Sequence, residues 1–81
     1  MSEVRITWSQ ARDLVLSRIR AWVESLPPAE RRLKILWPPY TLTPTEMLVH
    51  VETLDELGKK IVAAELAKIS EVTGITYIIS E

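Results

Sequence analysis

The stretch TPTEMLVHVETLDE, residues 43–56, decides the fold because it fits either a strand or a helix. Its first four residues, TPTE, form a capping box with proline at the first helical position. Residues 47–52, however, are rich in β-forming side chains, and the closing TLDE is a second capping box. One continuous helix over residues 44–72 would contain a redundant cap and an interior glycine. We therefore expect a strand over residues 46–52, with helix as the alternative for residues 44–52.

The residues before this stretch predict a strand, a helix and a second strand. Residues 3–7 alternate between polar and apolar side chains, which is the period of a strand with one buried face. Residues 8–26 follow an apolar period of 3.6, and Pro27-Pro28 ends this helix because proline lacks the N–H that another turn requires. Residues 33–37 then form the second strand, which ends at another proline pair.

The residues after it predict a helix and a last strand. Residues 54–72 carry an apolar stripe at helical spacing, Gly74 is a usual helix stop, and ITYII at residues 75–79 is rich in β-formers. The expected order is therefore βαββαβ. This order matches the ferredoxin-like architecture, an α+β fold in which a four-stranded antiparallel sheet has two helices on one face. We expect residues 1–81 to form a single domain.

Composition indicates a folded globule with an uneven charge. The chain has 81 residues, of which 47% are apolar and 26% charged, and it contains neither cysteine nor asparagine. Few thermolabile residues are typical of thermophile proteins. Residues 1–40 carry seven basic and four acidic groups, whereas residues 41–81 carry three basic and seven acidic groups. No signal-like or membrane-spanning apolar run is visible, so we expect a cytoplasmic location and no membrane partner.

The residue types needed for common cofactor and catalytic sites are scarce. One histidine and no cysteine leave too few soft ligands for a tetrahedral metal site. Two glycines far apart form neither a P-loop nor a dinucleotide fingerprint. His50 is the one candidate base of its kind, and no nucleophile motif accompanies it. We therefore expect no cofactor, no metal and no enzymatic activity.

The outer face of the expected sheet is the best candidate site. That face would carry large aliphatic side chains on three strands, where an open antiparallel sheet usually alternates to polar residues. We expect another chain to cover it. The sequence thus predicts a non-enzymatic protein–protein interaction module. We expect it to self-associate through this outer sheet face as a homodimer, and to serve as a small subunit or adaptor of a larger assembly. The expected interface residues are Arg5, Leu36, Leu48, His50 and Ile78.

An alternative function is nucleic-acid binding by the basic N-terminal half. Arg31, Arg32 and Lys34 form a short basic run that could contact phosphates. The sheet face expected here lacks the exposed aromatic residues on which RNA-binding sheets stack bases, and a solvated surface also explains the run.

One further contact is expected inside the domain. Glu65 and Arg12 lie near the apolar stripes of the two helices, and partly buried charges need partners. We expect these two side chains to form an ion pair between the helices.

Overall fold

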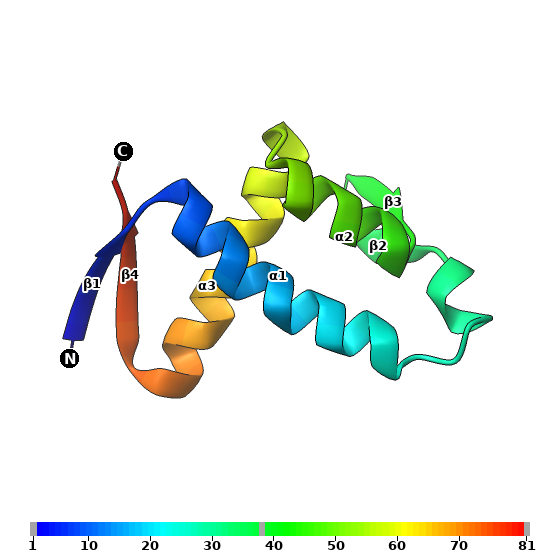
Figure 1. Cartoon of the computed structure of the whole chain (residues 1–81), viewed down its shortest axis with the longest axis horizontal. Coiled ribbons are helices and arrows are strands. Elements are labelled where there is room, and N and C mark those ends of the chain that lie inside the picture. Colours follow the sequence, from blue (N-terminus) through cyan, green and yellow to red (C-terminus); the bar gives the residue numbers. More distant parts are fainter. Residues whose placement is uncertain (1, 38, 81) are drawn as a thin grey trace.

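The computed structural model describes residues 2–37 and 39–80, apart from the side chains of residues 36 and 37 (Figure 1). Its elements in chain order are β1 (Ser2–Ile6), α1 (Trp8–Ser25), the 3-10 helix η1 (Glu30–Arg32), β2 (Ile35–Trp37), β3 (Tyr40–Leu42), α2 (Pro44–Thr53), α3 (Glu56–Thr73) and β4 (Ile75–Ile79). The molecule is elongated, with extents of 40 × 24 × 21 Å. In the part of the chain that is described, no helix is long and apolar enough to cross a membrane.

The expected strand over residues 46–52 is wrong, because this stretch forms the helix α2. Both hydrogen bonds of the capping box are made: Glu46 N–H donates to Thr43 Oγ1 at 3.1 Å, and Thr43 N–H donates to Glu46 Oε1 at 2.9 Å. Pro44 is buried at the first turn. Local capping and the burial of Met47 and Val51 therefore outweigh the β-propensity of this stretch.

A sharp break between α2 and α3 explains why two caps occur in succession. Leu54 adopts a left-handed conformation with φ 52°, which ends α2. Asp55 then caps α3, since its Oδ1 accepts a hydrogen bond from Gly58 N–H at 2.7 Å. The second cap is therefore not redundant: it starts a new helix in a new direction.

The ferredoxin-like four-stranded antiparallel sheet is also wrong. The described residues form two separate two-stranded sheets, one in which β1 pairs in parallel with β4 and one in which β2 pairs antiparallel with β3. Once the expected third strand is a helix, β1 pairs with the last strand instead. β2 pairs locally with β3, the next strand along the chain. The expected helices over residues 8–26 and 54–72 agree closely with α1 and α3.

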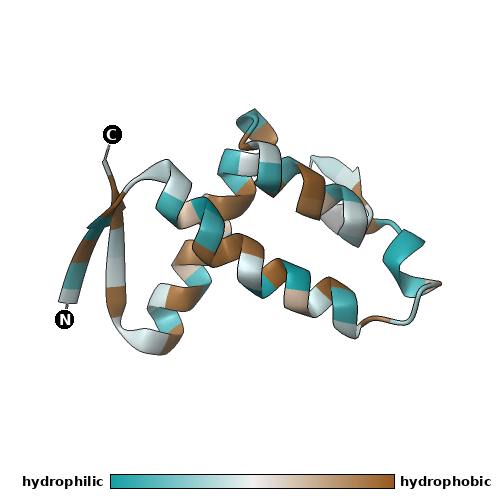
Figure 2. Ribbon diagram, in the orientation of Figure 1, coloured by the Kyte–Doolittle hydropathy of each residue, from teal (hydrophilic) through white to brown (hydrophobic). Residues whose placement is uncertain are grey.

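The core lies among the three helices rather than between helices and a large sheet. Figure 2 shows hydrophobic segments on all three helices, including the region where α1 passes α3. The β1–β4 sheet lies at one end of the molecule and the β2–β3 hairpin toward the other (Figure 1). The buried core residues are Ala11, Val15, Ile19, Val23, Leu42, Met47, Val51, Ile61, Val62, Leu66 and Ile69.

Candidate functional site

The β1–β4 sheet presents one face to the helices and the other to solvent. In its register Ile6 pairs with Ile79 and Arg5 pairs with Ile78. Ile6, Tyr77 and Ile79 pack against the core, so the residues between them point to the outer face. That outer face carries Glu3, Arg5, Thr76 and Ile78.

Two of the expected interface residues meet on this outer face. Arg5 is exposed and its partner in the register, Ile78, is half-buried. Glu3, which was not among the expected interface residues, is also exposed and lies two residues before Arg5 on the same face. The i, i+2 spacing of these opposite charges was the signal that could have identified it.

The other expected interface residues lie elsewhere, because the sheet that would have joined them does not exist. Leu48 and His50 are on α2, where Leu48 packs against the core. Leu36 lies in β2 opposite Thr41, and its side chain is outside the described part of the structure. The expected single face is therefore divided among different elements, and among the expected interface residues only Arg5 and Ile78 share a sheet.

His50 has a structural partner at the junction of α2 and α3. Its Nδ1 donates to Asp55 Oδ2 at 2.6 Å, while the other carboxylate oxygen caps α3. Hydrogen bonds from the Gly58 N–H and from the His50 ring hold the pKa of the Asp55 carboxyl below its ordinary value. The pair thus stabilises a helix start.

One of the three residues expected to contact nucleic acid, Arg31, makes hydrogen bonds within the fold. The Arg31 guanidinium donates to the main-chain carbonyls of Leu26 and Glu24, both at 3.0 Å, at the C-terminal end of α1. Arg32 and Lys34 are exposed. On α3, another basic group has a partner within the fold: Lys59 Nζ lies 5.3 Å from the centre of the Trp8 ring, which is a cation–π contact.

The expected ion pair between Arg12 and Glu65 is wrong. Arg12 Nε lies 3.1 Å from Asp13 Oδ1, beside it on α1. Glu65, whose side chain is only 18% exposed, pairs instead with Lys68 at 3.2 Å. Each charge therefore finds a partner on its own helix: Arg12 pairs with the adjacent Asp13, and Glu65 pairs with Lys68 three residues later, where helical side chains are neighbours.

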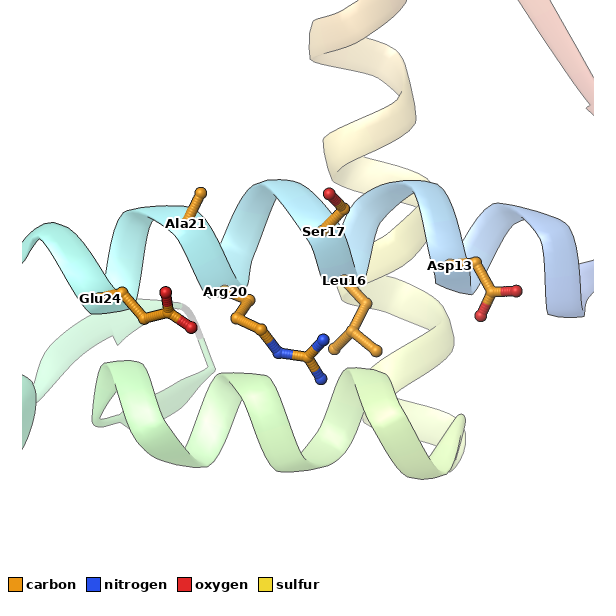
Figure 3. Close-up of a pocket in the computed structure, with 6 residues that line it drawn as sticks. All are labelled: Asp13, Leu16, Ser17, Arg20, Ala21 and Glu24. Carbon is orange, nitrogen blue, oxygen red and sulfur yellow. The ribbon is translucent and has the colours of Figure 1, made fainter.

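Two surface hollows flank α1. The first, shown in Figure 3, is lined by α1 residues alone, with Leu16 and Arg20 directed toward α2 and with Asp13 and Glu24 at its ends. The second, of about 390 Å³, is bordered by α1, β2, α2 and α3. It is lined by Arg18, Ile19, Trp22, Ile35, Met47, Glu65 and Lys68. Glu65 and Lys68, its titratable residues on α3, already pair with each other.

Comparisons with protein-family models, with curated proteins and with solved structures found no match. The candidate site is therefore the β1–β4 sheet, on the geometry of this chain alone.

Proposed function

We propose that this chain is a non-enzymatic protein–protein interaction module that self-associates through the β1–β4 sheet as a homodimer. The observation that supports this proposal is the sheet itself, which has two parallel strands and lies at one end of the molecule (Figure 1). A two-stranded sheet is marginal by itself. A second chain that pairs with the open edge of this sheet would extend it.

The exposed side chains of β1 also favour a protein partner. Four of its five residues are exposed, including Val4 with 37% of its surface accessible. A strand at a sheet edge presents main-chain N–H and C=O groups that pair readily with another strand. Within the described residues no further strand lies beside β1.

Nucleic-acid binding is the weaker alternative. Arg31 is the first residue of the basic run, and its guanidinium is already bound to two carbonyls at the end of α1. A phosphate would have to compete with these hydrogen bonds or bind Arg32 and Lys34 alone. No retardation of DNA or RNA at low salt would eliminate this alternative.

Sedimentation velocity over about 1–100 µM, a range that covers typical homodimer affinities, tests the proposal. We expect the mass to approach twice the 9.3 kDa of the monomer as the concentration rises. Arg5→Pro removes a main-chain N–H from the edge strand β1, so it should give a folded monomer. The matched control Val49→Glu changes an exposed side chain on α2 and should still dimerise. A monomer at every concentration would overturn the proposal, as would a dimer that Arg5→Pro leaves unaffected.

A further inference from the structure

We infer that the second copy pairs with β1 in antiparallel orientation, strand β1 to strand β1, in the register that places Glu3 of each copy opposite Arg5 of the other. This inference rests on the proposed self-association and specifies its geometry. The result would be one continuous sheet across the dimer, in the order β4, β1, β1 and β4.

The hydrogen bonds of the existing sheet show which groups of β1 face the free edge. Ser80 N–H donates to Ile6 C=O at 2.9 Å, so Ile6 directs its main-chain groups toward β4. Main-chain groups alternate in direction along a strand, so Val4 also faces β4. Glu3 and Arg5 therefore direct their N–H and C=O groups away from β4, toward the open edge.

This direction limits the registers open to a symmetric antiparallel pair. In an antiparallel pair of strands, two opposite residues can exchange both main-chain hydrogen bonds only if each directs its N–H and C=O toward the other strand. In β1 the residues that do so at the open edge are Glu3 and Arg5. Placing Glu3 opposite Glu3, or Arg5 opposite Arg5, brings like charges together. Placing Glu3 opposite Arg5 brings opposite charges together twice, once on each side of the two-fold axis. Charge complementarity thus selects one register.

In this register the two-fold axis passes between Val4 of one copy and Val4 of the other. The two Val4 side chains face each other in a pair without main-chain hydrogen bonds, where Cα atoms approach to about 4.5 Å. Val4 is 37% exposed, so it has apolar surface left to bury. The other edge of the sheet, along β4, offers no such selection, because β4 has the sequence ITYII and carries no charge to specify a register.

Charge reversal tests the register. Glu3→Arg and Arg5→Glu each place like charges opposite one another in a homodimer, so each should weaken dimerisation about tenfold or more. An equimolar mixture of the two variants restores both opposite-charge pairs and should dimerise as the unmodified chain does. The double variant Glu3→Arg/Arg5→Glu should dimerise too. Single variants that dimerise normally, or a mixture that stays monomeric, would overturn the inference.

Cysteine crosslinking provides a second test, since the natural chain has no cysteine. Val4→Cys should form a disulfide-linked dimer under mild oxidation, because the expected Cα separation lies within the range of a disulfide. The matched control Ser2→Cys should not, because the register places Ser2 opposite Ile6 of the second copy and the two Ser2 positions far apart. A crosslink in Ser2→Cys and none in Val4→Cys would overturn the register. If the unmodified chain dimerises but both tests fail, the inference fails and the proposed function stands; if the chain is monomeric, both fail.

Discussion

His50 and Asp55 join the end of α2 to the start of α3, with His50 Nδ1 only 2.6 Å from Asp55 Oδ2. The second oxygen of the same carboxylate accepts the Gly58 N–H at 2.7 Å. One carboxylate therefore caps α3 and also holds the only histidine of the chain. The direction in which α3 leaves α2 depends on this group.

Stability should decrease in acid because of Asp55 and Glu46. The Gly58 N–H and the His50 ring lower the pKa of Asp55, and the Thr43 N–H and hydroxyl lower that of Glu46. A lowered pKa in the folded state means that the ionised form favours folding. This contribution is present above the ordinary pKa values and is lost as the pH falls from about 5 through the lowered ones.

Thermal melting between pH 7 and about pH 3 checks this dependence, over the range in which carboxyls titrate. The melting temperature should fall steadily below about pH 5, and Asp55→Asn should show a smaller fall than the unmodified chain. Glu71→Gln, an exposed change near the other end of α3, is the control and should keep the full acid dependence. An equal fall in Asp55→Asn would contradict the role of this carboxylate.

Gly58→Ala should destabilise the fold strongly. A β-carbon at Gly58 would clash with the main-chain carbonyl of His50, a backbone group that cannot rotate away. Overpacking of this kind costs about 1–3 kcal/mol or more. Lys59→Ala, at the next and exposed position, should cost much less. Chemical denaturation gives both values, and equal free energies of unfolding for the two variants would show that α2 and α3 are not in close contact here.

Arg31→Ala should reduce stability, whereas Arg32→Ala should leave it nearly unchanged. Arg31 donates to two carbonyls at the end of α1, and losing hydrogen bonds of this kind costs about 1–2 kcal/mol. Arg32 is exposed and makes no hydrogen bond through its side chain within the described residues. Denaturant midpoints measure the difference, and a larger loss in Arg32→Ala would contradict this assignment.

The sequence predicted the parts of the fold that depend on long, regular patterns. α1 and α3 follow from their apolar stripes and their stops at Pro27-Pro28 and Gly74. The prediction for residues 46–52 was wrong because helix and strand signals conflict there. β-Propensity does not show that Met47 and Val51 are buried in the core. The left-handed Leu54, which lets two caps follow one another, has no sequence signal, since leucine rarely adopts this conformation.

Only part of the candidate site could be predicted from the sequence, because strand pairing depends on the whole fold. Arg5 and Ile78 were expected on one open sheet face, and they do lie side by side on β1 and β4. Their strand partners could not be foreseen, because sheet pairing joins residues far apart in the sequence and depended on the helix at residues 44–53. Leu48 and His50 lie on α2 instead, so they are not part of this sheet face.

Amide hydrogen exchange along β1, measured residue by residue at high and low protein concentration, tests the central claim most directly. The Val4 and Ile6 amides face β4 and should be protected at both concentrations. The Glu3 and Arg5 amides should be protected only at the concentration where the dimer forms, because only the second copy binds them. Exchange of Glu3 and Arg5 at the rate of an open chain at every concentration, while Val4 and Ile6 stay protected, would contradict pairing at this edge.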